Sequence, residues 1–195
     1  MEEVKTGTTT VGVVTNNGIV FAADKRATAG SIVIGKEIEK VIPVTDNIVI
    51  TISGLVGDCQ KLAEWLKAEL KLYEIRNGRK ASVKTAATIL SNILYGNRFY
   101  MPYYVQLLLG GYDSDFHLFS IGADGSTVEH KYMSTGSGST FALGVLDNEY
   151  SKSMNKKEAI DIAKKAVNIA MGRDIYSGEG ITIYYLSRKG LEKVA

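Results

Sequence analysis

The order of hydrophobic patterns along the chain predicts an α+β fold in which strands and helices are segregated into layers. Strand patterns come first, and two helical patterns, more strands, two further helices and a last strand follow. Such segregated runs favour a layered α+β architecture over a doubly wound parallel sheet. The 195 residues carry no linker, repeat or low-complexity segment, so we expect a single domain.

Two pairs of strands open the chain. Residues 8–15 and 19–24 alternate around Asn16-Asn17-Gly18, which is the strongest short hairpin signal in the sequence. Residues 41–44 and 48–53 form a second pair around Asp46-Asn47. We therefore expect two strand pairs before the first helix.

Two helices follow these strands. Asp58 is the expected N-cap of the first helix, and Asn77-Gly78 ends it. Ser82 can cap the second helix, which stops before Met101-Pro102. Apolar residues recur at helical spacing in both, at Leu62, Leu66, Leu70 and Tyr73 and then at Ala86, Ile89, Leu90, Ile93 and Leu94. We expect Trp65 to pack beside the first of these stripes.

The second half of the chain repeats this order. Strand patterns cover residues 104–110, 116–122 and 127–133, and residues 140–150 look helical. Asn155 with Glu158 three positions later is a capping signature that opens another helix. Residues 181–186 form the last predicted strand.

The composition is that of an ordinary soluble globular protein, with 45% apolar and 23% charged residues. A net charge of +2 without a basic run argues against nucleic acid or acidic lipid as a partner. No apolar stretch is long enough to span a membrane, and the first five residues lack the apolar core of a signal peptide. The single cysteine, Cys59, excludes an internal disulfide, which suits a cytoplasmic location.

Several other chemical sites have weak support. His117 and His130 are the only histidines and there is one cysteine, so we expect exposed strand or turn histidines and no bound metal. Cys59 is predicted near a helix start, where a thiolate would be stabilised, but a small buried core residue is the favoured interpretation. The run Gly136-Ser137-Gly138-Ser139 precedes a helix and could hold an anion, although it is not a phosphate-binding P-loop.

The stretch Gly7-Thr8-Thr9-Thr10 allows two interpretations. Threonine and valine favour strands for steric reasons, so an ordinary edge strand is the simpler one. In the other, cleavage between Gly7 and Thr8 exposes Thr8 as an N-terminal nucleophile with its own α-amine as general base. The local pattern alone favours the strand.

A series of motifs along the whole chain bears on this choice. They are Thr8-Thr9-Thr10-Val11-Gly12, Ala23-Asp24-Lys25-Arg26-Ala27-Thr28, Lys40, Gly54-Leu55-Val56-Gly57-Asp58, Ser134-Thr135-Gly136-Ser137-Gly138-Ser139, and Arg173-Asp174 with Ser177-Gly178. In this order they closely resemble β-type subunits of the proteasome core particle, the archaeal kind most of all. The resemblance runs from Thr8 to about Arg188, nearly the whole chain.

The resemblance implies the fold of N-terminal nucleophile (Ntn) hydrolases, a four-layer αββα sandwich with antiparallel sheets between helix pairs. It also implies a heptameric ring of β-type subunits that stacks on a second such ring between rings of α-type subunits. The implied function is that of a threonine endopeptidase acting on unfolded polypeptide without a cofactor. A separate ATP-dependent unfoldase would feed the particle through the α rings.

The same resemblance assigns roles to residues far apart in the chain. Thr8 matches the nucleophile, whose free α-amine, with a pKa of about 8, could accept the hydroxyl proton near neutral pH. Lys40 would stay cationic and lower the proton affinity of that hydroxyl, and Asp24 would orient Lys40. The residues that match those around the threonine amine are Ser137, Asp174 and Ser177. Gly54 matches the residue whose amide forms the oxyanion hole.

Substrate contacts are implied in the same way. Thr28 and Gly54 would pair with an extended substrate by strand addition, which tolerates many sequences. The residues implied to line the specificity pocket are Ala27, Ile38, Ile52, Val56 and Gln60. Small and aliphatic side chains prevail there, without an acid except what neighbouring subunits add, so we expect cleavage after apolar residues.

Residues 1–7 match a short propeptide, and residues 8–195 match one Ntn-hydrolase domain. The Thr8 hydroxyl would attack the carbonyl of Gly7, where a glycine minimises crowding. One alternative is a structural, non-catalytic β-type subunit that keeps residues 1–7 and completes a mixed ring. Another is an Ntn amidase for small substrates, which the specific similarity to proteasome sequences disfavours.

Overall fold

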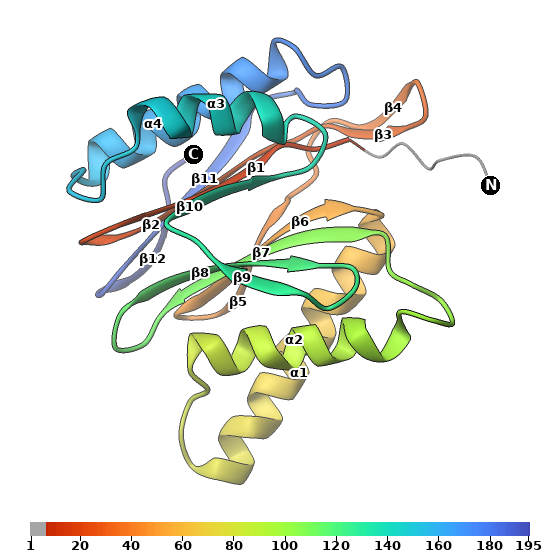
Figure 1. Cartoon of the computed structure of the whole chain (residues 1–195), viewed down its shortest axis with the longest axis vertical. Coiled ribbons are helices and arrows are strands. Elements are labelled where there is room, and N and C mark those ends of the chain that lie inside the picture. The colour runs from red at the N-terminus through yellow and green to blue at the C-terminus, as the bar shows by residue number, and fades with distance from the viewer. Residues whose placement is uncertain (1–6) are drawn as a thin grey trace.

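Two antiparallel sheets lie face to face between two pairs of helices in the computed structural model, which describes residues 7–195 (Figure 1). Each sheet has five strands, and a separate two-stranded hairpin projects beside them. The α+β class and the four-layer αββα sandwich expected from the sequence are therefore confirmed.

The first sheet is built around the N-terminal strand. Its order is β10 (Tyr132–Thr135), β1 (Thr10–Thr15), β2 (Gly18–Asp24), β11 (Ile181–Ser187) and β12 (Gly190–Lys193). Helices α3 (Ser139–Glu149) and α4 (Lys156–Met171) cover its outer face (Figure 1). Strands β1 and β2 are buried along their whole length, because helices cover one side and the second sheet covers the other.

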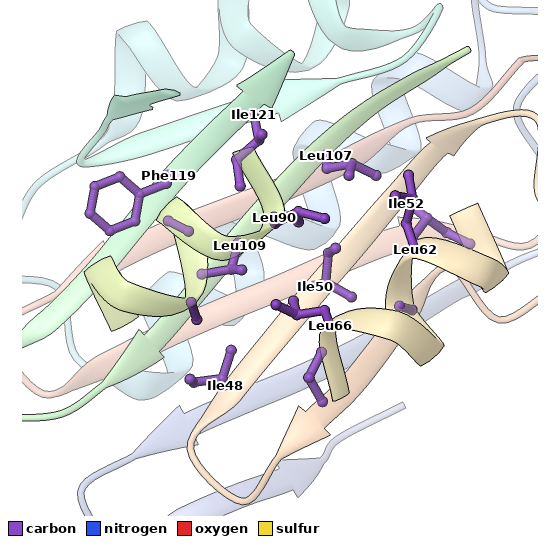
Figure 2. Close-up of a cluster of buried hydrophobic side chains, with 14 of the residues drawn as sticks. Ile48, Ile50, Ile52, Leu62, Leu66, Leu90, Leu107, Leu109, Phe119 and Ile121 are labelled. Carbon is purple, nitrogen blue, oxygen red and sulfur yellow. The ribbon is translucent and has the colours of Figure 1, made fainter. Parts of the chain in front are cut away.

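The second sheet packs its outer face against the other helix pair. Its order is β5 (Val41–Thr45), β6 (Ile48–Gly54), β7 (Val105–Tyr112), β8 (Phe116–Gly122) and β9 (Thr127–Glu129). The helices are α1 (Val56–Asn77) and α2 (Val83–Asn97). Figure 2 shows Ile48, Ile50 and Ile52 at alternate positions of β6, in one cluster with Leu62 and Leu66 of α1.

A third apolar layer lies between the two sheets. Phe21 of the first sheet belongs to it together with Val49 and Leu108 of the second. A polar contact also joins the sheets, because Thr51 Oγ1 donates a hydrogen bond of 3.1 Å to Thr10 Oγ1. The sheets are thus fixed face to face, and the residues at their edges are held in place.

The predicted start of α1 was wrong by two residues. Leu55 is the N-cap, with extended backbone and no capping side chain, whereas Asp58 lies in the first turn. There Asp58 accepts a hydrogen bond from the backbone of Tyr104 at 3.1 Å, and its charge suits the positive end of the helix. Trp65 is 46% exposed and meets Tyr103 edge-on, so it only borders the apolar stripe.

The predicted strand 127–133 is two strands in different sheets. The chain changes sheets between them, because the His130 amide donates to Leu118 of the second sheet and the Lys131 carbonyl accepts from Val14 of the first. The sequence analysis also missed β12 and the small hairpin of β3 (Ala27–Ala29) and β4 (Ile32–Gly35). The caps at Gly78, Ser82 and Asn155 are confirmed.

Candidate active site

Thr8 lies two residues before β1 and is only 5% exposed. Its backbone N–H donates to Ser137 Oγ at 3.2 Å, and its Oγ1 donates to the carbonyl oxygen of Gly7 at 2.6 Å. The Thr8 carbonyl accepts from the Gly138 N–H at 3.3 Å. The nitrogen, hydroxyl and carbonyl of Thr8 are therefore each fixed by a hydrogen bond.

Ser137 connects Thr8 to a buried carboxylate beyond the end of α4. Ser137 Oγ donates to Asp174 Oδ2 at 2.6 Å, and Ser177 Oγ donates to the same oxygen at 2.6 Å. The Tyr176 N–H donates to Asp174 Oδ1 at 3.2 Å. These contacts form one chain of hydrogen bonds from the Thr8 nitrogen to the Asp174 carboxylate.

Asp24, the last residue of β2, is a second and fully buried carboxylate. Its Oδ1 accepts from Lys40 Nζ at 2.7 Å and from the Thr9 N–H at 2.9 Å. Its Oδ2 accepts from the backbone N–H groups of Arg26, at 3.1 Å, and Gly178, at 2.9 Å. Two donors on each oxygen replace the water that burial removes.

The Lys40 side chain is buried with its partner, at 4% exposure for the residue. Burial lowers the pKa of the Lys40 ammonium from its ordinary value, while the charge of Asp24 and the hydrogen bond to it act in the opposite direction. A lysine with a lowered pKa releases its proton more readily than an exposed lysine. The ion pair at 2.7 Å therefore joins a structural contact to a group able to take part in proton transfer.

Three glycines allow close approach of the backbone at this site. A Cβ atom at Gly136 would lie 2.1 Å from the Thr8 oxygen, and one at Gly138 would lie 2.0 Å from Thr9 Oγ1. Gly54 has φ +122°, and a Cβ there would lie 1.9 Å from the Tyr104 oxygen. The residues around Gly136 therefore pack against the two threonines, which occupy the space where the alternative interpretation put an anion.

Part of the predicted substrate region lies close to Thr8. Ala27 and Thr28 are buried on β3, and Thr28 Oγ1 accepts a hydrogen bond of 3.4 Å from the Gly7 N–H. The Ile38 N–H donates to the carbonyl of Lys25 at 3.0 Å. The structure thus brings Thr28 to the residue before Thr8 and ties Ile38 to the segment after Asp24.

The other predicted pocket residues come from β6 and α1. The Ile52 N–H donates to the Lys40 carbonyl at 2.9 Å, but the Ile52 side chain packs in the core cluster of α1 (Figure 2). Val56 is half-buried and Gln60 is exposed at the start of α1. Their backbones lie near the site, and a pocket lined by their side chains stays a prediction.

Three contributors to the site were missed as functional residues in the sequence. Thr9 binds Asp24 through its amide and Ser177 through its hydroxyl at 2.8 Å. Gly178 donates its amide to Asp24. The repeated threonines and the Ser177-Gly178 pair stand out in the sequence, but backbone donors leave no residue-type signal.

The other residues considered for chemistry lie elsewhere. Cys59 is buried in the α1 core, as expected, and burial raises the pKa of its thiol to about 12. His117 contacts Glu129 at 2.6 Å and His130 contacts Ser120 at 2.8 Å, and both histidines are half-buried rather than exposed. Within residues 7–195 no three His, Cys, Asp or Glu side chains are grouped as a metal site, and no helix is long and apolar enough to cross a membrane.

A separate groove of ≈ 840 Å³ lies between α1 and the turn from β5 to β6. Its walls carry Lys67, Lys71 and Lys80 beside Glu64 and Glu74. Opposite charges side by side create little net field for a charged ligand. The groove contains none of the residues around Thr8, so the hydrogen-bonded cluster is the better candidate for catalysis.

A sandwich of two sheets between helix pairs, with a buried threonine at the head of a central strand, is an Ntn-hydrolase-type fold. The family described as Proteasome subunit matches residues 4–186. Proteasome subunit beta 1 of Thermococcus gammatolerans is 45% identical over 188 residues, which cover 96% of this chain and 93% of the relative. Proteasome subunit beta of Methanocorpusculum labreanum is 48% identical over 193 residues, with 98% and 91% coverage. The chain therefore belongs to the proteasome subunit family, as a β subunit of the archaeal type.

Proposed function

We propose that the chain is a proteolytic β subunit of the proteasome core particle. It is a threonine endopeptidase that hydrolyses unfolded polypeptides, with a preference for cleavage after apolar residues. One observation carries the proposal: Thr8 Oγ1 contacts the Gly7 carbonyl at 2.6 Å while the Thr8 nitrogen is linked through Ser137 to Asp174. A nucleophile that first cuts its own preceding bond and then uses its own amine as base requires both contacts.

The first proposed step is removal of the propeptide, residues 1–7. Thr8 Oγ attacks the carbonyl carbon of Gly7, so that a C–O bond forms, the C–N bond breaks and the hydroxyl proton passes to the Thr8 nitrogen. Water then hydrolyses this ester, which leaves a carboxylate on Gly7 and a free amine on Thr8. The close contact between Thr8 Oγ1 and the Gly7 oxygen supports this step, because proximity supplies much of the rate of such an intramolecular reaction.

In the second proposed step the free amine activates the hydroxyl toward a peptide substrate. The amine, with a pKa of about 8, accepts the proton as Thr8 Oγ attacks, and the leaving amine of the substrate then takes that proton. Lys40, oriented by Asp24, stabilises the alkoxide, and the amide of Gly54 stabilises the oxyanion. Water releases the acyl group in the reverse sense.

The remaining roles follow the same scheme. Ser137, Asp174 and Ser177 hold the amine and a water molecule, which their mutual hydrogen bonds support. Thr28 and Gly54 pair with the extended substrate. The residues proposed to line the pocket are Ala27, Ile38, Ile52, Val56 and Gln60.

The proposed setting is a cytoplasmic core particle. The names of the relatives, which are proteasome subunits, support assembly with other β-type subunits in a heptameric ring and with α-type subunits. An ATP-dependent unfoldase acting through the α rings would supply the unfolded chains.

The Thr8 hydroxyl is the group to test. Thr8→Ala in the assembled particle should keep the propeptide and lose peptide hydrolysis, whereas the matched variant Thr8→Ser, which retains a hydroxyl, should still lose the propeptide. Intact-mass measurement distinguishes the two forms by the mass of residues 1–7. Loss of the propeptide from Thr8→Ala would contradict self-processing.

A further inference from the structure

The residue before Thr8 faces a side chain to which the proposed mechanism gives no role. A Cβ atom at Gly7 would lie 1.6 Å from the Cβ of Tyr176, 2.5 Å from its Cγ and 2.9 Å from its Cα. Real Cβ atoms essentially never come within 3.0 Å of another heavy atom. Any side chain at position 7 therefore requires Tyr176 or the Gly7 backbone to move.

Tyr176 is held in place by its own loop. Its N–H donates to Asp174 Oδ1 at 3.2 Å. On one side the Ile175 carbonyl accepts from Arg26 Nη1 at 2.8 Å, and on the other the Gly178 N–H donates to the buried carboxylate at the end of β2 at 2.9 Å. Displacing Tyr176 would disturb contacts on both sides, so its Cα and Cβ form a rigid wall.

Gly7 is held as well. Its N–H donates to Thr28 Oγ1 at 3.4 Å, and its carbonyl oxygen accepts from Thr8 Oγ1 at 2.6 Å. Moving Gly7 away from Tyr176 would separate the nucleophile from the carbonyl that it must attack. The three atoms nearest the missing Cβ all belong to Tyr176, so this position points toward the loop after α4.

We infer that Tyr176 restricts the residue before Thr8 to glycine during removal of the propeptide. The inference rests on the proposed self-cleavage and adds a specificity-determining residue to it. A peptide substrate is a separate chain and can approach Thr8 with its side chain turned away from Tyr176. The propeptide is continuous with Thr8 and has no such freedom. Self-cleavage and substrate cleavage therefore follow different rules for the residue before the scissile bond.

The test is a double-mutant cycle on the rate of propeptide loss, followed by intact mass during assembly of the particle. Gly7 and Gly7→Ala are compared in three backgrounds: native, Tyr176→Gly and Tyr176→Ala. Tyr176→Gly removes the Cβ and Cγ of the wall, whereas Tyr176→Ala keeps the Cβ that would lie at 1.6 Å. The ratio of the two rates within one background cancels any general effect of the Tyr176 change on the loop or on Asp174.

In the native background Gly7→Ala should slow propeptide loss by about tenfold to 100-fold, from the usual penalty for overpacking. With Tyr176→Gly the ratio should fall to within about threefold of unity, and with Tyr176→Ala it should stay near the native value. The same ratio in all three backgrounds would overturn the inference, while propeptide loss from the native chain would leave the proposed function intact. A native particle that assembles and keeps residues 1–7 would contradict both.

Discussion

Four hydrogen-bond donors converge on the carboxylate of Asp24, and they come from different parts of the chain. Lys40 supplies the only charged donor, and Thr9, Arg26 and Gly178 supply backbone N–H groups. A neutral side chain of the same shape cannot accept from all four. At the residue scale, the site therefore depends on the charge and on both oxygens of Asp24.

We predict that Asp24→Asn destabilises the particle by about 3–5 kcal/mol and abolishes hydrolysis, because it leaves the Lys40 charge buried without a partner. Its amide group would also face two backbone donors. Urea unfolding and a peptide assay measure the two effects. The control is Glu64→Gln, which removes an exposed ion pair with Lys61 at 2.7 Å and should change stability by less than about 1 kcal/mol. Equal effects of the two variants would contradict this account of Asp24.

The buried thiol of Cys59 predicts a pH dependence of stability. Its pKa is raised to about 12 in the folded chain, whereas a thiol in the unfolded chain ionises near about 8.5. Between these values the unfolded chain binds fewer protons than the folded chain, so the free energy of unfolding falls as pH rises, by at most about 1.4 kcal/mol per pH unit. Cys59→Ala should show a shallower fall between about pH 9 and pH 11 in urea titrations. Parallel curves for the two proteins would contradict it.

At the scale of elements, α4 carries Asp174 just beyond its end and begins with a complete capping box. The Asn155 side chain accepts from the Glu158 N–H at 3.1 Å, and Glu158 accepts from the Asn155 N–H at 2.8 Å. Apolar residues on one face of the helix pack on the first sheet. The cap and this face together fix the direction in which Asp174 leaves the helix.

We predict that Asn155→Ala lowers the free energy of unfolding by about 1 kcal/mol, within the range of measured N-cap losses. Asn168→Ala on the exposed face of the same helix should be neutral or slightly stabilising, because alanine has the higher helix propensity. Urea unfolding of both variants measures the difference. A loss at Asn168 as large as that at Asn155 would contradict the role of the cap.

Elements with a local signal could be predicted from the sequence, and those set by tertiary contacts could not. The hairpin at Asn16-Asn17-Gly18 and the capping box at Asn155 were predicted because turn and cap chemistry lies within a few residues. The β3–β4 hairpin was missed because Ile32, Val33 and Ile34 are exposed, which breaks the alternation that marks a strand. The change of sheet at His130 depends on partners from both sheets, which no local pattern records.

The same distinction applies to the site. The resemblance identified Asp24, Lys40, Ser137 and Asp174, and the structure places them in two connected hydrogen-bond groups around Thr8 and Thr9. The backbone donors and Tyr176 were not identified, because their roles depend on loop geometry rather than on residue type. The inward packing of Ile52 follows from its place on β6, between the sheet and α1.

At the scale of the whole molecule, the site joins the two sheets. Thr8 and Asp24 belong to the ends of β1 and β2, whereas Lys40 precedes β5 of the second sheet. The apolar layer between the sheets, with Phe21, Val49 and Leu108, holds these edges in register. The buried ion pair can form only when this packing is complete, so folding and assembly of the site are one event.

The central claim is that Thr8 becomes the first residue of an active protease. The most direct measurement is the N-terminal residue of the assembled native particle, determined together with turnover of an apolar fluorogenic peptide. The account predicts a chain that begins at Thr8 and hydrolyses the peptide. Assembled rings whose β chains still begin at Met1 and do not hydrolyse the peptide would contradict it and would indicate a structural subunit.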